Sequence, residues 1–162
     1  MLERMESLLD RQLELYQSLV EMSHRKQQVL VRGDLQELES IIKAEQALLW
    51  QAGKLEESRL ALQGELAASA GLKPEELDLS KLAELAGEPF ASRYKSLQGC
   101  MVAIMDQLGA INRLNMELIE QSLSYINFSL ELLSGAEAGE TYTPAGKSPG
   151  RKDVTRLLDR KV

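Results

Sequence analysis

The amino-acid sequence predicts an all-α fold, an antiparallel long-helix bundle of coiled-coil-like character. Residues that favour helix (Leu, Glu, Gln, Lys, Arg, Ala and Met) dominate the 162 positions. Aromatic residues make up only 4%, and β-branched runs are missing, so a sheet is not expected. Apolar residues also recur at spacings of three and four over long stretches, as they do in amphipathic helices. We expect three main helices, a short connector helix and a flexible C-terminal tail.

The first helix is predicted over about residues 2–31. Its apolar stripe consists of Leu2, Met5, Leu9, Leu13, Tyr16, Val20 and Leu30. Gly33 suits the position just after a helix, and Asp34 suits the N-cap of a new helix that has Glu37 three residues on. A link this short makes the two helices antiparallel neighbours. One long helix kinked at Gly33 is the alternative that the sequence leaves open.

The second helix is predicted over about residues 34–70, along a heptad-type seam. The apolar members of this seam are Leu38, Ile41, Leu48, Ala52, Leu55, Leu62 and Leu66. Glu45 and Arg59 interrupt it, and each is expected to reach solvent or a partner on another helix. Pro74 then suggests a short connector helix that begins at this residue. Its leucines, which should dock it on the bundle, are Leu77, Leu79, Leu82 and Leu85.

The third helix is predicted over about residues 90–133. Its inner seam comprises Tyr94, Leu97, Met101, Ile104, Leu108, Ile111, Asn115 and Leu118. Asn115 is polar at a seam position, where asparagine commonly fixes the register of packed helices. Beyond it the helix is apolar on more sides than one neighbour can cover, so a second partner is expected. We therefore predict a helical bundle over residues 1–134 and a flexible tail over residues 135–162.

Composition and motifs argue against several functional classes. The net charge of −6 argues against a general nucleic-acid binder. Cys100 and His24 are the only residues of their kinds and lie far apart, so we expect no metal site and no cofactor. Cys100 lies among apolar residues and is expected to be buried as a small hydrophobic side chain. Catalytic and nucleotide-binding motifs are missing, and no enzyme is predicted.

The N-terminal residues carry frequent charges, and no run of residues is apolar enough for a membrane span. A cytoplasmic protein without stable membrane insertion is therefore expected.

An ordered set of motifs in the third helix and the tail points to a family. Asn112, Asn115 and Leu118 form an N-x-x-N-x-x-L pattern, leucine-rich sequence follows, and Tyr142 and Gly146 form a Y-x-x-x-G pattern. A Gly-Asp-Leu break at residues 33–35 precedes them in the first half. Over about residues 1–147 the sequence resembles the FlgN family of flagellar type III export chaperones.

The resemblance implies a cytoplasmic chaperone without catalytic activity. Such a protein binds the C-terminal regions of the hook–filament junction proteins FlgK and FlgL, prevents their premature assembly and delivers them to the export gate. The substrate terminus is an amphipathic helix, and the residues expected to bind it share one stripe: Ile119, Leu123, Ile126, Leu130 and Leu133. The alternatives left open are packing of this stripe on the protein's own helices or on a second copy, giving a homodimer.

The resemblance also assigns roles outside that stripe. Tyr142 and Gly146 are expected to contact the export gate protein FlhA. Apart from the resemblance, Asn112 and Asn115 are expected to form a structural polar seam. Two other readings of the whole chain remain open, namely a structural or adaptor coiled coil without an export role, and a chaperone of another flagellar substrate such as the filament cap.

Overall fold

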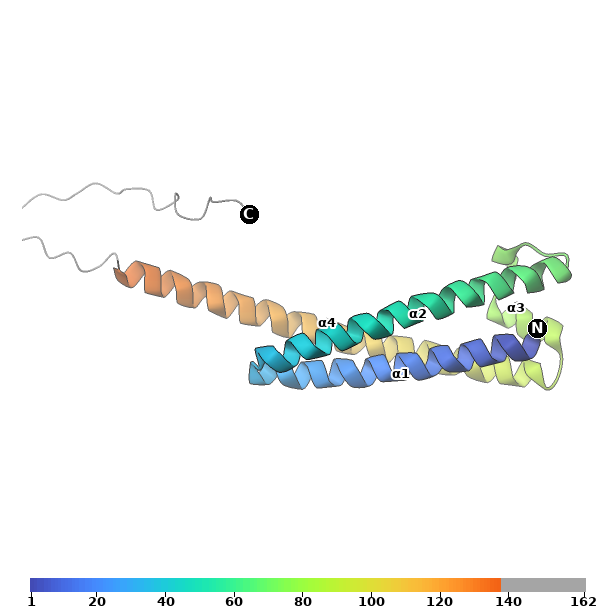
Figure 1. Cartoon of the computed structure of the whole chain (residues 1–162), viewed down its shortest axis with the longest axis horizontal. Coiled ribbons are helices and arrows are strands. Elements are labelled where there is room, and N and C mark those ends of the chain that lie inside the picture. Colours follow the sequence, from blue (N-terminus) through green and yellow to red (C-terminus); the bar gives the residue numbers. More distant parts are fainter. Residues whose placement is uncertain (138–162) are drawn as a thin grey trace, which may run out of the picture. The chain divides into compact units, whose positions relative to one another are not determined.

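The computed structural model describes residues 1–137, and these residues are almost entirely helical (Figure 1). The elements in chain order are α1 (Leu2–Arg32), α2 (Leu35–Ser69), the short 3₁₀ helix η1 (Pro74–Glu76), α3 (Leu79–Ala86) and α4 (Phe90–Glu137). No strand occurs within this described range. The prediction of an all-α fold built from long packed helices is confirmed.

The chain divides into two units, residues Met1–Leu123 and Ser124–Val162. The first unit holds α1, α2, η1, α3 and the larger part of α4. The described part of the second unit is the remainder of α4, residues 124–137. The helix thus includes residues 135–137, which were predicted to belong to the tail; the tail from residue 138 on lies outside the described residues.

Gly33 ends α1 and reverses the chain. Its φ of 70° is left-handed, and its N–H donates to the Val29 carbonyl at 2.9 Å, which closes the last turn of α1. The Asp34 side chain then accepts from the Glu37 N–H at 3.0 Å and caps α2. The two helices pack side by side over much of their length (Figure 1). Gly33 is therefore a turn between two antiparallel helices, not a kink within one.

The connector differs from the prediction in two respects. Pro74 begins the single turn of η1, whereas α3 starts at Leu79, because the Asp78 side chain caps that helix by accepting from the Lys81 N–H. Leu77 and Leu82 enter the core as expected, but Leu85 is 53% exposed. The connector shares one hydrophobic core with α1, α2 and α4. The buried members of this core are Met5, Leu8, Leu9, Leu62, Leu66, Ala67, Leu77, Leu82, Ala83, Tyr94 and Leu97.

Contacts between α4 and α1 show that these helices run parallel and in step. The Tyr94 hydroxyl donates to the Leu2 carbonyl at 2.7 Å, and the Asn115 side chain donates to the Ser23 carbonyl at 2.9 Å. Tyr94 and Asn115 are as far apart along α4 as Leu2 and Ser23 are along α1, so the two helices keep the same register at both contacts. Since α1 and α2 are antiparallel, α4 is antiparallel to α2 within the first unit.

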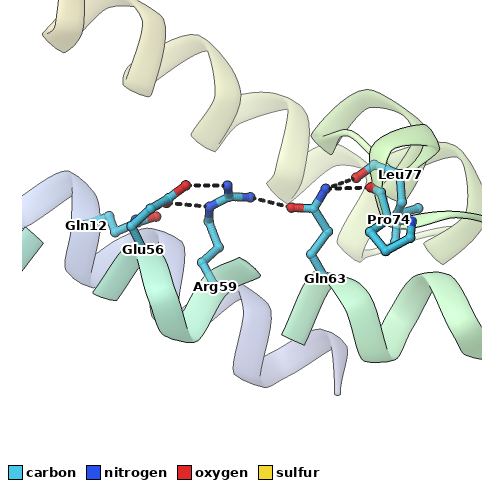
Figure 2. Close-up of polar contacts among 6 residues, drawn as sticks. All are labelled: Gln12, Glu56, Arg59, Gln63, Pro74 and Leu77. Carbon is cyan, nitrogen blue, oxygen red and sulfur yellow. Dashed lines mark hydrogen bonds and ion pairs between the residues drawn. The ribbon is translucent and has the colours of Figure 1, made fainter. Parts of the chain in front are cut away.

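A chain of polar contacts ties α1, α2 and the connector together (Figure 2). Gln12 of α1 donates to Glu56 at 2.9 Å, and Arg59 binds the same carboxylate at 2.7 and 2.8 Å. Arg59 also donates to Gln63, whose amide donates to the carbonyls of Pro74 and Leu77 at 3.0 and 2.7 Å. The hydrogen bond from Arg59 lowers the pKa of Glu56, despite partial burial of the carboxyl group.

The two polar interruptions predicted in the α2 seam are therefore satisfied differently. Arg59 pairs with Glu56 on its own helix. Glu45 reaches across to α1, where it forms an ion pair with Lys26 at 2.7 Å and accepts from the Ser23 hydroxyl. The Lys26 and Glu45 side chains are both largely shielded from water, so this pair replaces an apolar contact in the seam.

Cys100 is exposed on α4, so the prediction that it is buried was wrong. Its neighbours Met101 and Val102 are apolar, but Met101 is only half-buried and Val102 is exposed. The apolar residues of α4 therefore do not all mark one buried face.

Candidate functional site

The apolar residues toward the end of α4 are exposed in the described structure. Seven large apolar side chains in this segment are between 51% and 72% exposed: Leu123, Tyr125, Ile126, Phe128, Leu130, Leu132 and Leu133. All but Leu123 belong to the second unit. Monomeric proteins rarely expose so many neighbouring apolar groups without a partner to cover them. This segment is the strongest candidate for a binding surface.

The five residues predicted to bind substrate fall in two settings. Ile119 is half-buried in the first unit, where Leu123 is exposed. The other three, Ile126, Leu130 and Leu133, are exposed in the second unit. All five belong to one helix and recur at alternating spacings of four and three, which is the spacing of a single helical stripe.

Asn115, which precedes the exposed segment on α4, lies in a buried polar cluster. It is 2% exposed, and its amide donates to the Ser23 carbonyl, while its own side-chain oxygen has no partner. The Ser23 hydroxyl lies 3.3 Å from both Asn112 and Glu45. Asn115 is thus buried, whereas Asn112 is exposed and contacts the cluster through its side-chain oxygen. Their shared role as a structural polar seam stays a prediction.

The polar cluster contains residues that the sequence reasoning did not assign to it. These residues are Lys26 and Ser23 of α1, which the apolar stripe predicted for that helix does not include. The interruption of the α2 seam by Glu45 was a usable signal, because a carboxylate in a seam needs a partner. Its partner could not be named, because the sequence does not fix the register between α1 and α2.

The arrangement suits contact with another helix. An exposed apolar stripe on a helix can lie in a groove, or take a partner helix against it, through contacts at spacings of three and four. Among the described residues there is no group of three or more His, Cys, Asp or Glu side chains that could hold a metal ion. Within the same range, no helix is both long enough and apolar enough to cross a membrane.

Tyr142 and Gly146, the residues expected to contact the export gate, lie outside the described residues. Their role remains a prediction from the sequence.

Comparison with known proteins agrees with the motif pattern. The family model described as FlgN protein matches residues 1–150, nearly the whole chain. No curated protein and no solved structure shows a significant match to the chain. A long-helix bundle, an apolar helical segment left exposed, and a family match over this length together support one conclusion: the chain belongs to the FlgN family of flagellar export chaperones.

Proposed function

We propose that this chaperone binds the C-terminal segments of FlgK and FlgL through the apolar stripe of α4. The observation that carries the proposal is the exposure of Leu123, Ile126, Leu130 and Leu133 in a member of this family. The substrate segment is an amphipathic helix that would otherwise assemble with its neighbours. Covering its apolar face prevents premature assembly and removes the chaperone's own apolar surface from water.

The proposal includes delivery to the export gate in the cytoplasm, without a catalytic step. Tyr142 supplies an aromatic anchor with a hydroxyl group, the kind of side chain that often dominates a binding interface, and Gly146 completes the motif. The gate partner is FlhA. Substrate binding and gate binding are thereby assigned to separate parts of the chain.

Calorimetry with synthetic C-terminal segments tests the choice of substrate. The purified protein is titrated with the FlgK, FlgL and filament-cap segments in parallel, and then in competition. We expect the FlgK and FlgL segments to bind with micromolar or tighter affinity. We also expect that the cap segment displaces neither of them. No binding of any segment would support the structural or adaptor coiled coil, and preference for the cap segment would support another flagellar substrate.

The substitution Tyr142→Ala tests the division of labour. It should weaken binding to the cytoplasmic part of FlhA by at least about tenfold, the loss typical of an aromatic anchor, and leave FlgK binding unchanged. Surface plasmon resonance with each partner measures both quantities. Equal loss for both partners, or loss for neither, contradicts the assignment.

A further inference from the structure

The outer face of the α1–α2 pair carries a groove that the substrate surface does not use. Three hollows of about 440, 240 and 520 Å³ lie in a row between the two helices. Consecutive hollows share lining residues, Ser18 and Leu48 in one case and Arg11 and Leu55 in the other, so they form one groove. None of their lining residues belongs to α4, so the groove is separate from the seam that holds α4.

The lining of the groove has the periodicity of a helix-docking surface. On α1 it includes a stripe at spacings of three and four: Leu8, Arg11, Leu15, Ser18, Met22 and Arg25. Glu14 and Glu21 also line the two hollows farther from Trp50, so the acidic side chains of the groove lie away from the hollow that Trp50 lines. On α2 the small residues Ala44 and Ala47 leave room for close approach at one end. The stripe from Leu8 to Arg25 is about 26 Å long, which matches a helix of about 17 residues.

The charges select the kind of helix that fits. Six of the 19 Lys and Arg residues and four of the 25 Asp and Glu residues lie after Ser134, so residues 1–134 carry a net charge of −8. Against this acidic background, the only charged residues lining the largest hollow are Arg11 and Lys54. Arg11 forms no ion pair with any described residue, and the ion pair of Lys54 with Glu57 is solvent-exposed and therefore weak. This end of the groove attracts carboxylates.

Trp50 adds an apolar anchor at the same end. It lines the largest hollow beside Arg11 and Lys54 and is 67% exposed. Tryptophan and arginine are among the residues most enriched at the energetic centres of protein interfaces.

The C-terminal segment of the chain itself does not suit this end of the groove. It is basic, with Arg151, Lys152 and Arg156, and would meet the like charges of Arg11 and Lys54.

We infer that the α1–α2 groove is a second protein-docking surface. Its partner is an amphipathic helix of another protein, with an apolar stripe along the groove and carboxylates beside Arg11 and Lys54. The groove and the α4 stripe share no residue, so the two surfaces are distinct binding sites.

The test uses the full chain and a pair of synthetic peptides. Each peptide is a helix of about 18 residues with leucines at spacings of three and four; one carries two glutamates in its last turn and the other two lysines. Trp50 is the only tryptophan in the chain, so its emission reports directly on the groove. We expect the acidic peptide to shift this emission to the blue, and to bind at least about tenfold tighter than the basic one at low salt.

Matched variants separate the groove from general charge effects. Arg11→Glu should weaken binding of the acidic peptide by about tenfold and strengthen binding of the basic peptide. The control is Arg4→Glu, because Arg4 is exposed on the same helix and lines none of the three hollows. This control should change the affinity for neither peptide. Ile126→Asp on α4 should also leave peptide binding intact.

Three results would overturn the inference. The first is equal binding of the two peptides, and the second is loss of binding with Ile126→Asp, which would place the peptide on α4. The third is a blue shift of Trp50 emission that rises with protein concentration in the absence of peptide, because a second copy would then occupy the groove.

Discussion

Tyr94 illustrates how single residues fix the position of α4. Its ring is fully buried, and its hydroxyl donates to the Leu2 carbonyl at 2.7 Å. Burial, with a smaller contribution from Glu6, raises the pKa of Tyr94 to about 12. The folded protein therefore keeps this hydroxyl protonated at a pH where the unfolded chain has begun to ionise it.

Tyr94→Phe should lower the free energy of unfolding by about 1 kcal/mol at pH 7, because the hydrogen bond from the Tyr94 hydroxyl to the Leu2 carbonyl is lost. The wild-type protein loses stability as pH rises from 10 to 12, since only the unfolded tyrosine ionises in that window, and the variant lacks this loss. The difference between the proteins should thus shrink at high pH. Urea unfolding at pH 7 and pH 11 measures it, and a difference that grows with pH contradicts the assignment.

Asn115 provides a second test at the residue scale. Asn115→Ala should lower the free energy of unfolding by about 1 kcal/mol, because it removes a buried hydrogen bond from the Asn115 amide to the Ser23 carbonyl. Asn112→Ala is the matched control on the same helix and should cost less than about 0.5 kcal/mol, as its side chain is exposed. Chemical denaturation of both variants compares them. Equal costs would show that the cluster does not depend on Asn115.

Burial of individual residues was the least predictable property. Cys100 was assigned to the core from its apolar neighbours, yet Val102 and Met105 beside it are exposed. α4 has apolar residues on several faces, so composition alone could not identify the buried one. In α1, Gln12 is buried and donates to Glu56 of α2. The apolar pattern of α1 could not predict this burial, because the partner that satisfies the Gln12 amide lies on a different helix.

At the scale of elements, the turn at Gly33 was predictable because two adjacent residues encode it. A left-handed glycine followed by an aspartate N-cap is a local signal that needs no tertiary contact. The connector was harder, because Pro74 suits the first position of either a 3₁₀ or an α-helical turn. Only the Asp78 cap distinguishes where α3 begins.

Two glycines of the hairpin should respond to alanine with opposite signs. Gly33→Ala should destabilise the protein by about 1 kcal/mol, because alanine is strained at a φ of 70°. Gly53→Ala, within α2, meets no atom within 4 Å and should stabilise it by about 0.5–1 kcal/mol through helix propensity. Thermal unfolding of the two variants gives both signs. A destabilised Gly53→Ala protein would contradict the open surroundings described for that position.

At the scale of the whole molecule, the sequence predicted an all-α family member with an apolar excess in α4. It could not predict where burial along α4 ends within the first unit, because the seam spacing continues through Ile119 and Leu123 without a break. The change from buried Ile111 and Asn115 to exposed Leu123 depends on the register with α1 and α2, which tertiary packing sets.

The binding of the FlgK C-terminal segment to matched α4 and α2 variants tests the central claim most directly. Ile126 and Leu60 are both 51% exposed, so aspartate at either position has a similar intrinsic cost. Calorimetry should show that Ile126→Asp weakens binding by at least about tenfold, whereas Leu60→Asp changes it by less than about twofold. Equal affinity for the two variants would contradict the assignment of the substrate surface to α4.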